Sequence, residues 1–247
     1  LRLSKLHGAR TLAISNVIGS TITREADYTI YTHAGPEISV ASTKAFSVQM
    51  AVMYLLAFEM AYAKGCIDKE ECMRLTKELS DIPDVIEETM KCADRCQYVA
   101  SKLVTATSLL YIGRGLDYTL SMEGSLKLKE ISYIHSESYA AGELKHGSIS
   151  LIDKDFGVIA VVTDKEISEK TISNLKEVES RGANIVTITN IKDDDFSKYK
   201  ILLDDYNEVL NPLMAIIPMQ LLAYNIAKLK GCDIDKPRNL AKSVTVE

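Results

Sequence analysis

Leu109–Ile131, LLYIGRGLDYTLSMEGSLKLKEI, is the stretch that decides the fold. It opens with Leu109–Ile112, a short run that is apolar on both faces and is typical of a central strand covered by helices. The turn Gly113-Arg114-Gly115 follows, and from Tyr118 to Ile131 the apolar spacing is helical. A strand, a glycine turn and a helix in this order indicate an α/β fold with a parallel sheet.

The same alternation of short apolar runs and longer helical segments extends along the chain. We predict strands at Thr11–Ser15, Tyr28–Thr32, Leu109–Ile112, Ser148–Ile152, Val158–Val162, Ile185–Thr189 and Ile201–Leu203. We predict helices at Thr43–Lys64, Glu70–Ser80, Pro83–Leu103, Tyr118–Ile131, Glu166–Ser180 and Leu213–Lys230. Gly65 should end one helix and Pro83 start another, whereas Pro218 should bend the last helix or lie in its first turns. The expected architecture is a three-layer α/β fold, with a parallel sheet between helices.

An internal repeat predicts two copies of one α/β domain. Gly8-Ala9, the strand after it and Asn16-Val17 are echoed by Gly182-Ala183, the strand after it and Asn190-Ile191. Each series continues with a second short strand and a long apolar helix, which ends in Lys64-Gly65-Cys66 or Lys230-Gly231-Cys232. Since the second copy has a long segment before its glycine that the first copy lacks, we expect an amino-terminally truncated copy in 1–98. A complete copy should fill 99–231, and 232–247 should form a tail laid across the domains.

Composition excludes several classes of protein. The 247 residues are 47% hydrophobic and 26% charged, which is not the composition of a disordered or collagen-like chain. The longest apolar run, Met50–Tyr62, is interrupted by Glu59 and is shorter than the roughly 18 to 20 residues that cross a bilayer. Leu1–Arg10 is polar and helical in pattern, unlike a signal peptide. With a net charge of -5 and scattered basic residues, we expect a cytoplasmic chain with neither nucleic acid nor membrane as a partner.

The five cysteines do not form the pattern of a disulfide framework or a zinc site. Cys66, Cys72, Cys92 and Cys96 fall within one helical stretch, which has no CxxC pair and no nearby histidine. We interpret them as small buried hydrophobic residues and expect no metal.

A first cluster of candidate residues is Glu123, Lys127 and Glu130. On a helix these side chains share a face, so two carboxylates and an ammonium could converge on one spot. A solvated, salt-bridged face would show the same spacing. The position after a strand and a glycine turn favours a functional site, because ligands gather at the carboxyl ends of parallel strands. The turn lacks the full dinucleotide fingerprint, so we do not infer NAD.

Three further segments carry candidate residues. His135-Ser136-Glu137-Ser138 and the segment up to His146 look too polar for a strand, and His146 is either a proton shuttle or a surface histidine. Lys242 near the chain end is either solvated or, if the tail covers a site, a nucleophilic amine. Ser42 or Thr43 should cap the following helix, and their loop would also suit a sugar or an anion.

Four long motifs carry a resemblance that covers essentially the whole chain. They are EISVASTKAF at Glu37–Phe46, EGSLKLKEISYIH at Glu123–His135, YAAGELKHG at Tyr139–Gly147 and DKPRNLAKSVTVE at Asp235–Glu247. In these motifs the chain resembles the isomerase half of the glucosamine-6-phosphate synthase family, also called glutamine:fructose-6-phosphate aminotransferase (isomerizing). The resemblance implies a pair of sugar isomerase (SIS) domains and agrees with the repeat.

The resemblance also implies a role for each candidate residue. Lys242 would form a Schiff base with open-chain fructose 6-phosphate, Glu130 would move the proton between C1 and C2, and Lys127 would assist proton transfer at the sugar oxygens. His146 would open the sugar ring from a neighbouring subunit, which implies a homodimer. Further contacts to the sugar would come from Val40, Ser42 and Ala241. The expected ligands are fructose 6-phosphate and glucosamine 6-phosphate, with no cofactor and no metal.

Two parts of the family pattern are missing from this sequence. The Ser/Thr-rich loop that grips the sugar phosphate is absent, so we expect the 247 residues alone to bind fructose 6-phosphate poorly. The glutaminase domain, with its amino-terminal cysteine nucleophile, is also absent, so we expect it only in the full-length enzyme. An alternative is a regulatory module that binds a sugar phosphate without catalysis. The set of Lys127, Glu130, His146 and Lys242 favours the enzyme.

Overall fold

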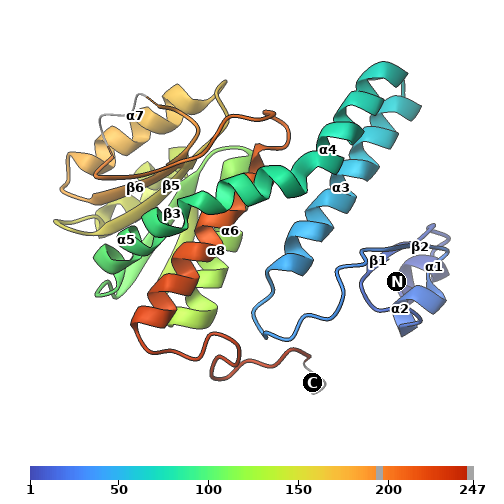
Figure 1. Ribbon diagram of the computed structural model, residues 1–247, viewed down its shortest axis with the longest axis horizontal. Coiled ribbons are helices and arrows are strands. Elements are labelled where there is room, and N and C mark those ends of the chain that lie inside the picture. The colour runs from blue at the N-terminus through green and yellow to red at the C-terminus, as the bar shows by residue number, and fades with distance from the viewer. Residues whose placement is uncertain (193–196, 244–247) are drawn as a thin grey trace. The chain divides into compact units, whose positions relative to one another are not determined.

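The computed structural model describes residues 1–192 and 197–243 and divides the chain into two compact units, 1–79 and 80–247. The helices and strands follow one another along the chain (Figure 1) as α1 (Arg2–Leu6), β1 (Leu12–Ser15), α2 (Thr21–Glu25), β2 (Tyr28–Tyr31), α3 (Lys44–Ala63), α4 (Lys69–Thr89), η1 (Met90–Cys92), α5 (Ala93–Leu103), β3 (Ser108–Gly113), α6 (Leu116–Ser132), β4 (His135–Ala140), η2 (Ala141–His146), η3 (Ser148–Leu151), β5 (Gly157–Val162), α7 (Ser168–Glu179), β6 (Asn184–Thr189), β7 (Tyr199–Leu202) and α8 (Asn211–Leu229). Each unit contains a parallel sheet, as the sequence predicts.

The first unit has a two-stranded parallel sheet, in which Leu12 of β1 lies opposite Tyr28 of β2. The short helix α2 connects the two strands and is absent from our predictions. At the start of the sheet, the Asp27 carboxylate accepts hydrogen bonds from the backbone N–H and the hydroxyl of Thr11, both at 2.8 Å. The long helix α3 follows after a loop and begins and ends within a residue of its predicted bounds.

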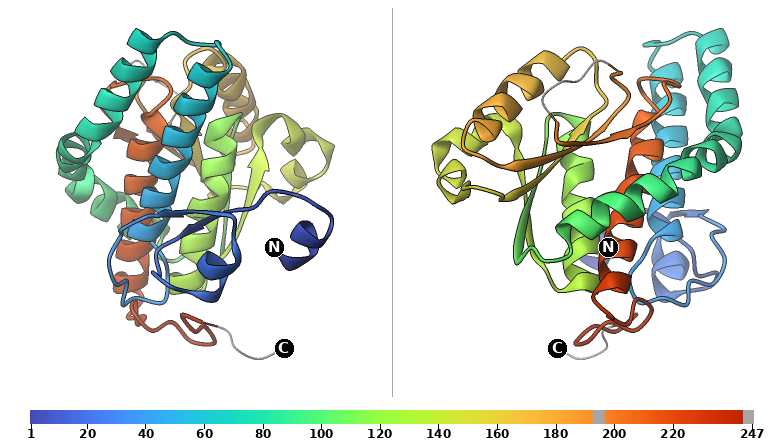
Figure 2. Two further views of the ribbon diagram at one scale, coloured as in Figure 1. Left: turned by 90° about the vertical axis from the view of Figure 1, so that its right-hand side faces the viewer. Right: turned by 60° about the vertical axis from the view of Figure 1, so that its left-hand side comes forward.

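The second unit is a three-layer sandwich around a five-stranded parallel sheet of order β4-β3-β5-β6-β7. Figure 2 shows α5, α6 and α8 on one face of this sheet and α7 on the other. The side chains of the central strands alternate between these layers, so that Leu110 and Ile112 pack with Leu175 and Val178 of α7. Every residue of β5 is buried, which confirms the prediction of central strands that are apolar on both faces.

The two long apolar helices end with the same glycine turn. After α3, the N–H of Gly65 donates to the carbonyl of Tyr62 at 2.9 Å and the N–H of Cys66 to that of Ala61 at 2.8 Å. After α8, Gly231 and Cys232 make the equivalent bonds at 3.1 and 3.0 Å, to Lys228 and Ala227. This is the Schellman pattern, with φ of 70° at Gly65 and 69° at Gly231. The prediction that Gly65 ends a helix is confirmed.

Several predicted elements differ from the structure. Ser148–Ile152 is not a strand, because residues Ser148–Leu151 form the 3-10 turn η3. The polar segment from His135 does form a strand, β4, at the edge of the sheet. Pro83 starts no helix: α4 continues through it to Thr89, and the helical path changes at η1 instead. Pro218 lies inside α8, as predicted, and beyond its first two turns.

Two helices, α3 and α8, are long and apolar enough to cross a membrane when judged by length and composition alone. Most of α8 is buried inside the second unit, as expected for a core helix, whereas only 6% of the corresponding window of α3 is buried. The burial of α8 supports the expectation that this helix crosses no membrane. For α3 the same expectation stays a prediction.

Candidate functional site

Helix α6 carries the predicted acid–base residues, and a close backbone approach fixes where it starts. A Cβ atom on Gly113 would lie 2.5 Å from the carbonyl carbon of Asp117, so this position requires glycine. The Asp117 carboxylate accepts hydrogen bonds from the backbone N–H of Thr163 at 2.7 Å and from its hydroxyl at 2.6 Å. Burial raises the pKa of Asp117, and these hydrogen bonds oppose that shift. The start of α6 is thus tied to the end of β5.

Lys127 is a buried ammonium shared by two carboxylates of the same helix. Its Nζ lies 2.6 Å from Oε2 of Glu130 and 3.4 Å from Oε1 of Glu123. The three side chains are 5%, 21% and 12% exposed, so this is not a solvated salt-bridged face. Burial raises the pKa of Glu123, and the charge of Lys127 opposes the shift. The convergence expected from the spacing is therefore present, in a partly desolvated place.

The acid–base cluster does not lie at the end of α6 that we predicted. We expected it near the carboxyl ends of the strands, where the amino terminus of α6 lies. Lys127 comes eleven residues after Leu116, which places it about 16 Å along the helix from that end. The acid–base cluster lies on the carboxyl-terminal half of α6, the half that leads into β4.

His146 lies at the end of η2, immediately beyond β4, and its side chain is exposed. The strand before it pairs with β3 over its whole length, from His135 opposite Ser108 to Ala140 opposite Gly113. The short 3-10 turn η2 thus places His146 beyond the carboxyl end of the edge strand β4. An exposed imidazole at this place is available to ligands or to a second chain.

In the first unit, Glu37 organises the loop that holds Val40 and Ser42. Its carboxylate accepts hydrogen bonds from the Ser42 hydroxyl at 2.6 Å and from the backbone N–H of Thr43 at 2.9 Å. Thr43 is the N-cap of α3, which confirms the predicted position, but its hydroxyl makes no side-chain capping bond. Glu37 supplies that function from six residues upstream, and both Val40 and Ser42 are half-buried.

The tail is attached to the end of α6 by Tyr133. The backbone N–H of Arg238 donates to the Tyr133 hydroxyl at 2.8 Å, and the Arg238 guanidinium lies 4.1 Å from the centre of the Tyr133 ring. Tyr133 follows α6 directly and has a left-handed φ of 60°. The residues Ala241 and Lys242 lie farther along this tail and are exposed, whereas residues 244–247 lie outside the described part of the chain.

Tyr133 and Glu37 are the residues that sequence reasoning missed. Both lie inside the quoted motifs, but their contacts join positions that are far apart or lie outside regular elements. No spacing rule for helices or strands connects them with their partners.

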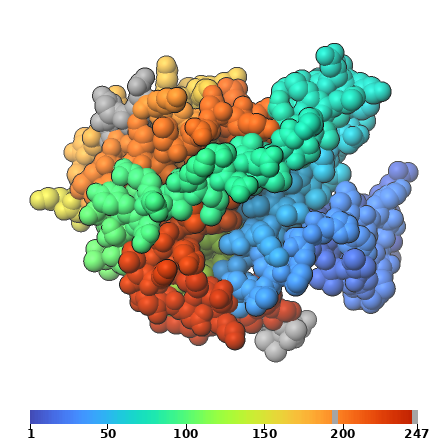
Figure 3. All heavy atoms as spheres, in the orientation of Figure 1, coloured from blue at the N-terminus to red at the C-terminus, as the bar shows by residue number. Residues whose placement is uncertain are grey.

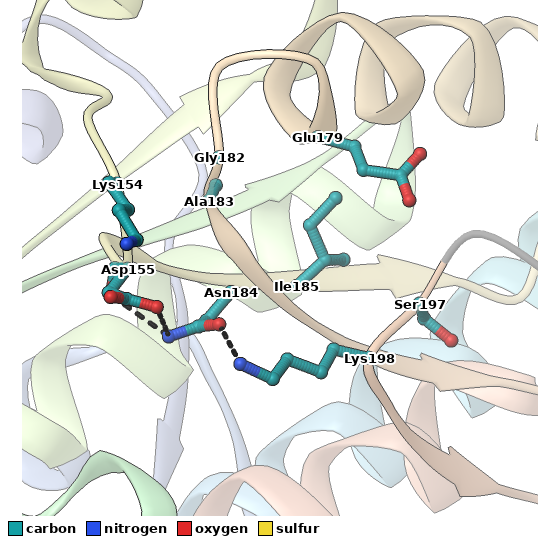
Figure 4. A pocket seen from close by; sticks show the side chains of 9 residues that line it. All are labelled: Lys154, Asp155, Glu179, Gly182, Ala183, Asn184, Ile185, Ser197 and Lys198. Carbon is teal, nitrogen blue, oxygen red and sulfur yellow. Dashed lines mark hydrogen bonds between the residues drawn. The ribbon is translucent and has the colours of Figure 1, made fainter.

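A hollow of about 430 Å³ lies at the amino-terminal ends of β6 and β7. Figure 4 shows its lining, in which Lys198 donates to Asn184 at 2.5 Å and Asn184 in turn contacts Asp155. None of the predicted site residues lines it. Within the described residues, no three His, Cys, Asp or Glu side chains are placed to hold a metal ion.

Comparison with known proteins identifies the family. The model of the SIS domain matches residues 1–59 and 102–229. A Clostridium perfringens protein named glutamine--fructose-6-phosphate aminotransferase (isomerizing) is 49% identical over 252 residues, and one with the same name from Clostridium tetani is 49% identical over 250. All of this chain is covered in both alignments, but it spans only 41% of the length of either relative.

Solved structures agree with this result. The C-terminal domain of glucosamine-fructose-6-phosphate aminotransferase from Francisella tularensis superposes with a TM-score of 0.90 at 36% identity, covering 96% of this chain and 68% of that one. A putative phosphosugar isomerase from Clostridium difficile, at 24% identity and a TM-score of 0.83, shares the fold. The chain therefore belongs to the SIS domain family, and within it to the group that contains the C-terminal domain of glucosamine-fructose-6-phosphate aminotransferase.

Proposed function

We propose that this chain is the isomerase part of an enzyme that makes glucosamine 6-phosphate from fructose 6-phosphate and ammonia derived from glutamine. The observation that carries the proposal is the buried Lys127, held between two carboxylates on α6. The names of the relatives supply the substrate class. Since this chain spans only part of their length, the glutaminase that releases the ammonia belongs to a further domain of the full-length enzyme.

The conversion of a ketose into an aldose amine needs three kinds of proton transfer. The sugar ring must open, the C1 proton must leave beside an imine, and a proton must return to C2. Glu130 would carry the proton between C1 and C2, since a carboxylate can act first as base and then as acid. Its Oε2 is buried against the Lys127 ammonium, whereas the side chain as a whole is 21% exposed, which leaves part of the carboxyl group open to a substrate C–H.

The ammonium of Lys127 would serve the sugar oxygens. A donor 2.6 Å from the base is close enough to hand a proton to an oxygen next to the carbon that reacts. Glu123 contacts the same ammonium as the second carboxylate of the cluster, with its Oε1 3.4 Å from Nζ. We infer that Glu123 and Lys127 hold Glu130 in place as well as moving protons themselves.

The remaining roles depend on residues from other segments. Lys242 would form the Schiff base that acts as the electron sink, and the Tyr133 contact supports this role because it attaches the tail to the helix that carries Glu130. His146 would open the ring in the neighbouring subunit of a homodimer, and its exposure supports a role across an interface. Contacts to the sugar would come from Val40, Ser42 and Ala241.

We also infer a domain organisation and a location. The sheet of each unit is parallel, and the two long helices end in the same turn, which supports two copies of one domain. We place the truncated first copy with its helical connector in 1–98, the second copy in 99–231 and the catalytic tail in 232–247. The absence of a metal requirement and a cytoplasmic location belong to the same proposal.

Borohydride trapping tests the proposed chemistry. Because the 247 residues alone are expected to bind fructose 6-phosphate poorly, the full-length enzyme is incubated with this sugar phosphate, reduced, digested and searched by mass spectrometry for a lysine that carries a hexitol phosphate. We expect the adduct on Lys242 and expect it to disappear in Lys242→Arg. Lys236→Arg changes an exposed lysine of the same tail and should leave the adduct in place.

The Clostridium perfringens relative is treated in parallel. An adduct on its matching lysine, but none on Lys242 here, would refute the catalytic role of this chain. Calorimetry with fructose 6-phosphate would then show whether the chain is a binding module without catalysis.

A further inference from the structure

Two cysteines outside the acid–base cluster lie in contact. The sulfur atoms of Cys92 and Cys96 are 3.7 Å apart, at the junction where η1 passes into α5. Cys92 is half-buried, whereas Cys96 is completely buried. A reagent from solvent can therefore reach the Cys92 thiol, whereas the Cys96 thiol is shielded from solvent.

The backbone at this junction is irregular. Cys92 is the last residue of η1 and the N-cap of α5, with φ of -72° and ψ of -2°. A disulfide needs a sulfur separation of about 2 Å and Cβ atoms about 4 Å apart, closer than the 5 to 6 Å of helix neighbours. A 3-10 turn is already wound more tightly than an α-helix, so tightening it further at Cys92 disturbs only the first turn of α5.

The exposed side of Cys92 faces a hollow of about 350 Å³. This hollow lies where the end of α4 and the start of α5 border the segment around β7, the green and orange surfaces that adjoin in Figure 3. Its charged lining residues are Lys91, Arg95, Lys200, Glu88 and Asp204. Three cations and two carboxylates leave a small excess of positive charge next to the thiol.

We propose that Cys92 and Cys96 form a redox-active dithiol that is oxidised by a low-molecular-weight disulfide bearing carboxylates, such as oxidised glutathione. The Cys92 thiolate attacks one sulfur of the reagent, forms a mixed disulfide and releases one thiolate of the reagent. Cys96 then loses its proton to that thiolate and attacks the Cys92 sulfur, releasing the second thiolate. Two protein thiols are oxidised, one reagent disulfide is reduced to two thiols, and the protein ends with a Cys92–Cys96 disulfide.

The electrostatics of the pair support this order of events. The hydrogen bond from Cys96 lowers the pKa of the Cys92 thiol, whereas that hydrogen bond and burial raise the pKa of the Cys96 thiol. Attack begins at the thiol with the larger thiolate fraction, and the partner reacts only once the mixed disulfide has placed an electrophilic sulfur beside it.

Site-resolved alkylation of the unaltered chain tests the proposal. The chain is incubated with oxidised glutathione, alkylated with iodoacetamide under denaturing conditions and digested for mass spectrometry. We expect Cys92 and Cys96 to lose alkylation together and to appear in one disulfide-linked species. Cys66, a free and exposed cysteine, should instead carry glutathione as a mixed disulfide.

Two variants separate the steps. Cys96→Ala should accumulate glutathione on Cys92, and Cys92→Ala should leave Cys96 fully alkylated because burial protects it. Cys66→Ala is the matched control and should not change the behaviour of the pair. The proposal is wrong if Cys92 and Cys96 both remain alkylated in the unaltered chain. It is also wrong if Cys96 reacts with oxidised glutathione as readily in Cys92→Ala as in the unaltered chain.

Discussion

Replacing Lys127 by methionine should cost the second unit a large part of its stability at neutral and alkaline pH. Methionine keeps the length and much of the apolar stem of lysine, so packing changes little. What disappears is the ammonium 2.6 Å from Glu130 and 3.4 Å from Glu123, which leaves two partly buried carboxylates facing each other. Removing one partner of a buried ion pair typically costs 3 to 5 kcal/mol, and because Glu130 is 21% exposed we expect about 3 kcal/mol.

The size of this loss should depend on pH, with a definite sign. Burial already raises the pKa of Glu123 in the folded chain, and loss of the ammonium raises it further. Between the ordinary glutamate pKa and this raised one, the folded variant binds more protons than the unfolded chain, so its stability falls as pH rises. The loss at pH 8 should therefore exceed the loss at pH 5 by about 1 kcal/mol or more, one pKa unit being worth about 1.4 kcal/mol.

Urea unfolding followed by circular dichroism measures both quantities, and Arg74 supplies the control. Arg74 lies between Glu71 at 2.6 Å and Glu78 at 2.5 Å with similar helical spacing, but its side chain is 49% exposed. Arg74→Met should therefore change the free energy of unfolding little at either pH. Adding Glu123→Gln and Glu130→Gln to Lys127→Met should restore much of the lost stability. The reasoning is refuted if Lys127→Met costs no more than Arg74→Met at pH 8, or if its cost is the same at pH 5.

Substitutions at three other positions test contacts of the tail, of the start of α3 and between α6 and α8. Tyr133→Phe removes the hydrogen bond from Arg238, which is worth about 1 kcal/mol, so proteolysis within the tail should be about fivefold faster. Proteolysis should be faster still in Tyr133→Ala, which also loses the ring under the Arg238 guanidinium. Equal rates in both variants and the unaltered chain would show that this contact does not hold the tail. Glu37→Ala removes the group that caps α3 and should raise amide hydrogen exchange in the first turn of that helix several-fold, as expected for about 1 kcal/mol, while its last turn stays unchanged. Gly124→Ala should lower the free energy of unfolding by about 2 kcal/mol, because the new methyl group would lie 2.5 Å from the Met219 sulfur; an unchanged urea midpoint would mean that Met219 moves aside freely.

The elements that could be predicted from the sequence are those whose pattern of apolar and charged side chains follows from the geometry of the strand or helix. The predicted strands β3, β5 and β6 agree with the structure to within a residue at each end, because buried strands in a parallel sheet are apolar on both faces. The Lys127 cluster could be predicted for a similar reason, since three and four residues along a helix always bring side chains onto one face.

Where prediction failed, the decisive interactions do not appear in a local pattern. Ser148–Leu151 has the alternation of a strand but forms a 3-10 turn, since a run of this length can satisfy either structure. Pro83 removes one helical hydrogen bond, and the neighbouring Leu79 and Ile82, both buried, keep α4 together across it. Glu37 caps α3 from six residues away, a distance for which no capping rule exists.

The paired but polar strand β4 has a consequence for how this edge of the sheet can vary. Of its six residues only Ser136 is fully buried, so the strand contributes main-chain hydrogen bonds rather than apolar area. The N–H of His135 points inward and donates to Thr107 at 3.2 Å, so the N–H groups of Glu137 and Tyr139 should face the sheet as well. A proline scan along this strand should therefore give alternating tolerance, with proline rejected at 135, 137 and 139 and better accepted at 138. Selection on this segment would act on every second amide, and the exposed side chains of the strand would be free to change without loss of the sheet.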